Sequence, residues 1–166
     1  KEKAIIVNGL SKSHAMTGWR IGYVVGHRVI MEDITAVHLY NTICASVPSQ
    51  YAAIEALTTQ LHIPKEMNQA YIQRRDYIYK RLIDMGLEVS KPTGAFYIFP
   101  SISKYEKNSF KFATDLLENV HLAVVPGRSF SEYGEGHIRL SFACSMGELT
   151  EAADRLEKYI KILDMK

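Results

Sequence analysis

The 166-residue sequence predicts an α/β fold that opens with a strand, a loop and a second strand and closes with a small α+β domain. Apolar runs at residues 4–7 and 23–25 flank a glycine-containing loop, a pattern typical of two strands. Helical apolar spacing recurs between residues 29 and 85, and short strand-like runs alternate with helical segments after residue 87. These three observations indicate a mixed fold with long helices in its middle.

The composition excludes several classes of protein. A chain with 47% hydrophobic and 23% charged residues is typical of a globular protein with one sizeable core or two small ones. The formal net charge of +2 and the scattered basic residues argue against a nucleic-acid partner. Cys44 and Cys144 match no zinc or redox spacing, so we expect a reduced cytoplasmic chain without a metal site. No apolar stretch approaches the roughly twenty residues of a membrane span.

The loop between the first two strands carries the strongest chemical signal. It contains Lys12 and, eight positions later, Arg20, at the mouth of the predicted sheet. Small-molecule sites of α/β proteins usually lie at such a place. A deprotonated lysine amine condenses with a carbonyl, whereas a guanidinium keeps its charge and binds phosphate with a fixed fork. Lys12 is therefore the candidate covalent group and Arg20 the candidate anchor. The alternative is a surface lysine and a structural arginine in a glycine-rich turn.

Three helices are expected in the middle of the chain. Pro48 and Pro64 stand at the starts of two of them, where proline is well tolerated, and Gly86 is placed to end the last. The segment 41–48 reads as a connection. The expected helices cover residues 29–40, 49–57 and 64–85.

The last part of the chain is expected to alternate strands with helices. Residues 87–89 and 95–99 predict a hairpin around the turn at residues 92–94. A helix over residues 109–119 has Ser109 as its expected cap. The side chains of that helix expected to face inward are Phe110, Ala113, Leu116 and Leu117. Further strands are predicted at residues 122–125 and 137–142, and a closing helix at residues 146–163.

The loop sequence as a whole resembles the pyridoxal-phosphate attachment site of the class I/II aminotransferases, a fold type I family. The resemblance rests on Gly9-Leu10-Ser11-Lys12 and Met16-Thr17-Gly18-Trp19-Arg20-Ile21-Gly22-Tyr23, at the family's spacing. It implies that Lys12 forms a Schiff base with pyridoxal 5'-phosphate and that Arg20 binds the cofactor phosphate. Many members have a serine three residues before the lysine, where this chain has Gly9. Ser11 is the candidate that supplies this hydroxyl.

Three segments of the second half add to the resemblance. Residues 92–97 are similar to the family's proline-glycine-alanine-phenylalanine-tyrosine hairpin, and residues 124–130 are similar to its valine-proline-glycine turn. In residues 137–143, Arg139 matches the arginine that binds the substrate's α-carboxylate. A guanidinium pairs with a planar carboxylate through two parallel hydrogen bonds, which fixes the orientation of the bound acid. For an isolated arginine in such a strand, a surface position with an extended aliphatic stem is the alternative.

The resemblance also implies a place for the chain within a longer protein. In the family the attachment lysine lies past the middle of the polypeptide, so residues 1–166 would be the C-terminal part. Lys1 in place of methionine agrees with a fragment or a processed product. Residues 1–63 would be the end of the large cofactor-binding domain, and residues 64–166 the small domain with its linking helix. Groups that contact the pyridine nitrogen would lie outside, so we expect little or no activity from residues 1–166 alone.

The function implied by the resemblance is the transfer of an amino group between an L-amino acid and a 2-oxo acid, in a homodimeric enzyme. A carbon-sulfur β-lyase, or another pyridoxal-phosphate enzyme of the same fold, stays open because the same lysine serves each reaction. An aminotransferase-like effector domain of a transcription regulator is a further alternative. The sequence does not indicate which amino acid and which oxo acid are used.

Overall fold

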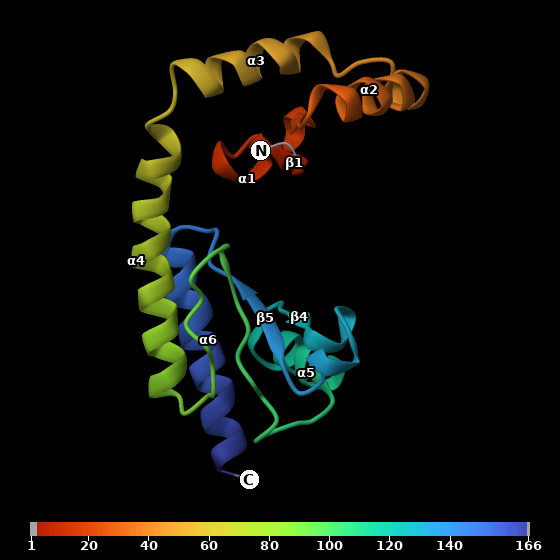
Figure 1. Ribbon diagram of the computed structural model, residues 1–166. Helices are drawn as coiled ribbons and strands as arrows, with labels where there is room; N and C mark the ends of the chain where they lie inside the picture. The colour runs from red at the N-terminus through yellow and green to blue at the C-terminus, as the bar shows by residue number, and fades with distance from the viewer. Residues whose placement is uncertain (1–2, 166) are drawn as a thin grey trace. The chain divides into compact units, whose positions relative to one another are not determined.

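Figure 1 shows the chain as a computed structural model that describes residues 3–165. The chain divides into two compact units, Lys1–Met67 and Asn68–Lys166, and each unit has its own hydrophobic core. The boundary between the units falls inside helix α4 (Ile63–Asp84). Within residues 3–165, no helix has the length and apolar character needed to cross a membrane.

The first unit begins with a two-stranded antiparallel sheet, as the sequence predicts. Strand β1 (Ile6–Gly9) pairs with β2 (Gly22–Val25), and Gly9 lies opposite Gly22 in this register. The two strands approach so closely here that a Cβ on Gly22 would lie 2.9 Å from the Asn8 carbonyl oxygen. Glycine at position 22 therefore permits the pairing that ends at the mouth of the loop.

The loop between these strands is more ordered than the sequence suggests. It contains a short helix, α1 (Leu10–Ser13), and a 3₁₀ turn, η1 (Thr17–Trp19). The side chains of Leu10 and Met16 are buried against Ala56, which anchors the loop to the rest of the unit. This small core fixes the backbone that carries Lys12.

Two helices complete the first unit and confirm the predicted segments. Helix α2 (Arg28–Thr42) is followed by the connection 43–46 and by α3 (Val47–Thr58), which has Pro48 in its first turn. Helix α3 buries Ser49 and Ala56, whereas no residue of α2 is buried in the part of the chain that the structure describes. The apolar side chains of α2 therefore stay open to contact with other protein.

The long predicted helix is confirmed as α4, which ends one residue before Met85. Gly86 follows with a left-handed backbone, φ +77°, and the Leu87 amide donates a hydrogen bond of 3.1 Å to the Leu82 carbonyl oxygen. This bond satisfies a carbonyl that the helix end leaves open, in the manner of a Schellman motif. Glycine at position 86 is the residue type that adopts this conformation without a steric cost.

The second unit is built around a three-stranded antiparallel sheet with the order β3-β5-β4. The central strand, β5 (Ile138–Ser141), lies within the predicted segment. It pairs on one side with β3 (Tyr97–Ile98) and on the other with β4 (Val125–Pro126). Arg139 therefore stands on the middle strand, opposite Val125.

Helices α4, α5 (Ser109–Val120) and α6 (Met146–Asp164) contribute side chains to one core with this sheet. Helix α6 confirms the predicted closing helix and begins with a capping box, in which Ser145 and Glu148 satisfy each other's backbone amides. The pKa of the Glu148 carboxyl is lowered by the hydrogen bonds from Ser145. The largest fully buried apolar residues of the unit include Leu82, Ile98, Phe112, Leu116, Ile138, Phe142 and Leu156.

The predicted hairpin is wrong. Residues 87–89 form no strand, and the Glu88 carbonyl accepts a hydrogen bond of 2.8 Å from the Ser101 amide. The predicted strand at residues 95–99 shrinks to the two residues of β3, which pairs with β5 instead. The predicted strand at residues 122–125 also shortens, to Val125–Pro126. Apolar runs this short do not encode their pairing partner, which long-range packing selects.

The inward face of α5 was predicted wrongly at two positions. Phe110 and Leu117 are 68% and 49% exposed, whereas Phe112 is buried and its ring meets Tyr159 of α6 edge to face, with centres 5.5 Å apart. Leu116 is buried as predicted. The helix carries two overlapping apolar sets at helical spacing, and contacts with α6 decide which of them faces the core. The cap is Asn108, whose Oδ1 accepts a 2.9 Å hydrogen bond from the Lys111 amide, rather than Ser109.

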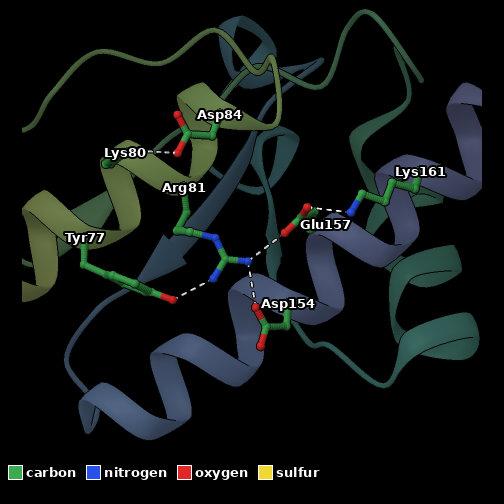
Figure 2. Close-up of polar contacts among 7 residues, drawn as sticks. All are labelled: Tyr77, Lys80, Arg81, Asp84, Asp154, Glu157 and Lys161. Carbon is green, nitrogen blue, oxygen red and sulfur yellow. Dashed lines mark hydrogen bonds and ion pairs between the residues drawn. The ribbon is translucent and has the colours of Figure 1, made fainter.

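An arginine joins α4 to α6 in the second unit (Figure 2). Arg81 Nη2 lies 2.7 Å from Asp154 Oδ1 and 2.8 Å from Glu157 Oε2, and its Nη1 donates to the Tyr77 hydroxyl at 2.6 Å. The hydrogen bond to Asp154, with those to Tyr77 and Glu157, raises the pKa of Arg81 above its ordinary value despite partial burial. The pKa of the Glu157 carboxyl is lowered by hydrogen bonds from Lys161 and Arg81.

We expect Arg81→Met to lower the free energy of unfolding of the second unit by about 1–3 kcal/mol. The change removes three hydrogen bonds of a side chain that is only 20% exposed and leaves two carboxylates close together without their cation. Urea denaturation of the wild type and the variant measures the difference. Lys80→Met is the matched control, because Lys80 pairs with Asp84 at a 76% exposed position, where an ion pair contributes about 0–1 kcal/mol. Equal midpoints for the Arg81 variant and the wild type would contradict the expectation.

Candidate functional site

The predicted site residues fall into two groups. Ser11, Lys12 and Arg20 lie in the loop of the first unit, and Arg139 lies on the central strand of the second. Each group has a backbone frame of its own.

The first frame places Lys12 one residue before the end of α1. Leu10, 2% exposed, is the buried residue of this turn, and its carbonyl accepts hydrogen bonds from the amides of His14 and Met16 at 3.2 and 3.3 Å. The Leu10 amide in turn donates to the Ile21 carbonyl at 3.5 Å. Because Leu10 points into the core, Lys12 is left exposed on the same turn and Ser11 is half-buried.

Arg20 ends the η1 turn in an uncommon backbone conformation. Its φ and ψ are 51° and 45°, in the left-handed region, which costs a residue with a side chain roughly 1–2 kcal/mol. Its Nη1 donates a 3.1 Å hydrogen bond to the Thr17 carbonyl. Such a conformation persists only where the surroundings impose it.

Ser49 supplies part of that restraint. Its hydroxyl, on α3, donates a 2.7 Å hydrogen bond to the Trp19 carbonyl, the peptide group that leads into Arg20. Ser49 is 5% exposed, so the donor side of this bond lies inside the unit. Sequence reasoning missed Ser49, because a serine next to Pro48 at a helix start looks like an ordinary cap. Only its burial and its bond to a residue thirty positions away reveal the role.

The loop therefore carries an amine and a guanidinium on one fixed backbone. The bond from Leu10 to Ile21 ties the start of α1 to the residue after Arg20, and the core of the unit holds both ends. Between them, a Cβ built on Gly18 would meet no atom within 4 Å, so the loop backbone is open there. The donor set suits a ligand with a carbonyl for the amine and a phosphate for the guanidinium.

The second frame presents Arg139 between aromatic rings. Its guanidinium carbon lies 4.3 Å from the centre of the Tyr97 ring and 4.7 Å from the centre of the Phe130 ring. Within residues 3–165, the guanidinium makes no hydrogen bond and no ion pair. Its N–H groups are therefore available to a planar anion such as a carboxylate.

The segment that carries Phe130 is tightly held. The Gly127 amide donates to the His137 carbonyl at 2.8 Å, and the Phe130 amide donates to the Gly127 carbonyl at 3.0 Å. A Cβ on Gly127 would overlap the Gly134 carbonyl oxygen, so the two stretches of backbone touch. Glu135 accepts a 2.7 Å hydrogen bond from the amide of Ser109 at the start of α5. Hydrogen bonds from Ser109 lower the pKa of the Glu135 carboxyl.

Comparison with known proteins gives one consistent result. The family model described as "Aminotransferase class I and II" matches residues 1–156. The chain is 53% identical to the probable N-acetyl-LL-diaminopimelate aminotransferase of Bacillus subtilis (strain 168), over 96% of this chain and 41% of the relative. It is 43% identical to an aspartate aminotransferase of Pyrococcus abyssi, over 96% of this chain and 42% of the relative.

A solved structure has the same fold. The crystal structure of the aromatic aminotransferase from Pyrococcus horikoshii OT3 matches with a TM-score of 0.91 and 41% identity, and the match covers 99% of this chain and 45% of that one. The chain spans about two-fifths of the length of the curated relatives it matches.

Proposed function

The chain belongs to the family of class I and II aminotransferases, and from this membership we propose that it is part of an enzyme that transfers an amino group between an L-amino acid and a 2-oxo acid. The observation that carries the proposal is the ordered loop that holds Lys12 and Arg20 on one backbone frame. Because the relatives are more than twice as long, we assign the activity to a polypeptide that contains these residues and the rest of that length. Little or no turnover is proposed for residues 1–166 by themselves.

The proposed cofactor is pyridoxal 5'-phosphate, bound by Lys12, Arg20 and Ser11. The residues present fit this group, since an exposed amine suits an aldehyde, and a guanidinium with a hydroxyl suits a phosphate dianion. When bound, the cofactor supplies a reactive carbonyl carbon and a ring that accepts electrons. The first unit would be the end of the cofactor-binding domain and the second unit the small domain.

The residues of this chain have separate tasks in the proposed reaction. Lys12 Nζ would hold the cofactor through its aldehyde, and the same nitrogen, as a free amine, would accept the proton from the substrate Cα. Arg139 binds the carboxylate that every amino acid and every 2-oxo acid carries, and so fixes which Cα bond faces the reacting group. Arg20 and Ser11 hold the phosphate and keep the reacting carbonyl near Lys12.

We expect Ser49→Ala to raise the dissociation constant for pyridoxal phosphate about tenfold, the equivalent of about 1.4 kcal/mol. The variant leaves the Trp19 carbonyl without its donor and is expected to loosen the backbone of Arg20. Titration of the cofactor-free, full-length protein, followed by absorbance, measures the constant. Thr58→Ala is the matched control, because Thr58 also donates to a carbonyl, that of Ile54, on the same helix but at an exposed position. Equal constants for Ser49→Ala and the control would refute the role of Ser49.

A homodimer in the cytoplasm is also proposed. Helices α2 and α3 expose apolar side chains that the rest of the longer polypeptide or a second subunit would cover: Val37 is 62% exposed, Tyr40 91% and Tyr51 71%. The two cysteines, Cys44 and Cys144, are both free, which supports a reducing compartment. Sedimentation of the full-length protein tests the dimer, and a monomer at micromolar concentration would contradict it.

The substrate pair is tested by a screen of amino donors and 2-oxo acids on the full-length protein. The relatives are named for aspartate, aromatic and N-acetyl-LL-diaminopimelate substrates, so these three classes are the first to try. Formation of a new amino acid from an added oxo acid supports amino-group transfer. Release of pyruvate and ammonia without an oxo acid would indicate a β-lyase, and no turnover with any pair would overturn the proposed function.

A further inference from the structure

Two arginines of the second unit are held in opposite ways. Arg81 donates three hydrogen bonds, one to a hydroxyl and two to carboxylates, which place negative charge beside its guanidinium (Figure 2). Arg139 has no hydroxyl or carboxylate partner within residues 3–165. Its guanidinium lies over the rings of Tyr97 and Phe130. The same side chain is thus paired with carboxylates at one position and has its N–H donors open at the other.

A ring contact restrains an arginine without occupying it. The face of an aromatic ring attracts the guanidinium through its flat side, whereas the N–H groups point outward within the guanidinium plane. A carboxylate partner does the reverse, because it takes two N–H groups and cancels the charge. Rings at 4.3 and 4.7 Å from the guanidinium carbon therefore limit its rotation and leave its hydrogen-bonding edge open.

Phe130 is itself supported from behind. Its ring meets Phe99 edge to face with centres 6.1 Å apart, and Phe99 stacks on His137 at 5.2 Å with an interplanar angle of 5°. Its backbone is fixed by the hydrogen bond to the Gly127 carbonyl. A ring with one ring contact and a fixed backbone is suited to holding a neighbour in place, although Phe130 is 51% exposed.

We propose that Phe130, together with Tyr97, is a positioning residue that keeps the guanidinium of Arg139 unpaired and in one orientation for the substrate carboxylate. The proposal rests on the proposed function, since it names the residues that prepare the carboxylate site of that same reaction. Phe130 acts through Arg139 and is not proposed to contact the substrate. Its effect is on carboxylate binding rather than on proton transfer.

The test compares three variants of the full-length protein loaded with cofactor. Phe130→Ala and Phe130→Leu are expected to raise KM for the amino-acid donor about tenfold and to leave kcat within about twofold. Phe130→Tyr keeps a ring face and is expected to retain wild-type KM. Phe110→Ala is the matched control, because Phe110 is an exposed phenylalanine of the same unit without a ring contact to Arg139. Wild-type KM in the leucine variant would overturn the role of the ring.

Two further measurements separate positioning from general damage. The half-reaction with a primary amine that lacks a carboxylate is expected to run at the wild-type rate in Phe130→Ala. In an Arg139→Gln background, adding Phe130→Ala is expected to change KM by less than about twofold. An equal tenfold effect in both backgrounds would refute action through Arg139. If the wild type itself turns over no amino acid, the proposed function fails; if it does and Phe130→Ala matches it, only this inference fails.

Discussion

Replacing Lys12 with arginine is expected to lower kcat of the full-length enzyme by about 10⁴-fold or more. Arginine keeps the positive charge, but a guanidinium does not lose its proton under ordinary conditions, so it neither condenses with an aldehyde nor accepts a proton from Cα. The fold is expected to survive, because Lys12 is exposed and Leu10 provides the packing of this turn. The loss would therefore report chemistry rather than unfolding.

Borohydride trapping followed by peptide mass analysis shows directly which lysine is linked to the cofactor. The wild type should carry the pyridoxyl mass on the peptide that contains Lys12, and the Lys12→Arg variant should carry none. Lys65→Arg serves as the control, since Lys65 is an exposed lysine at the start of α4 and is expected to leave both the activity and the label unchanged. A label on another lysine of the wild type would remove the basis of the proposed function.

Arg139→Lys is expected to reduce kcat/KM for amino acids by about 10²–10³-fold, since one or two charge-assisted hydrogen bonds of about 1.5–3 kcal/mol each lose their geometry. Lysine keeps the charge on a flexible stem but cannot bind a carboxylate with two parallel bonds. Steady-state kinetics with several amino donors gives the ratio. A primary amine without a carboxylate should react equally with variant and wild type.

Arg128→Lys is the matched control for that experiment. Arg128 lies eleven positions earlier in the same unit, and its exposed guanidinium is 3.7 Å from Glu132, a loose surface ion pair that lysine can replace. We expect its kcat/KM to stay within about twofold of the wild type. A similar loss in both arginine variants would point to a general electrostatic effect and against a specific carboxylate site at Arg139.

Much of the fold was predictable from local signals. The α/β class, the paired strands around the loop, and the helices α2, α4 and α6 are confirmed, because their periodicity spans enough residues to outweigh noise. The end of α4 was predictable from Gly86, because glycine readily adopts the left-handed backbone that ends the helix. The errors lie where tertiary contacts decide which strands pair and which helix face is buried. Strand β3 is two residues long and pairs with a distant strand, and the buried face of α5 is chosen by Tyr159 of α6.

The candidate site divides in the same way. Lys12, Arg20 and Arg139 stand out in the sequence because their residue types carry a definite chemistry at a recognisable spacing. Ser49 and Phe130 do not, since a serine at a helix start and a phenylalanine in a turn are ordinary by themselves. Their contacts, a hydrogen bond to the Trp19 carbonyl and a ring against a guanidinium, exist only after folding.

At Arg20, the left-handed backbone favours one type of residue and the proposed phosphate contact favours another. Glycine or asparagine would relax that conformation and make the loop more stable, but neither offers a guanidinium. The proposed function gives a reason for the arginine at this position, since its guanidinium would bind the cofactor phosphate. Under the proposed phosphate role of Arg20, relatives without that role are expected to have glycine or asparagine there more often than relatives that keep it.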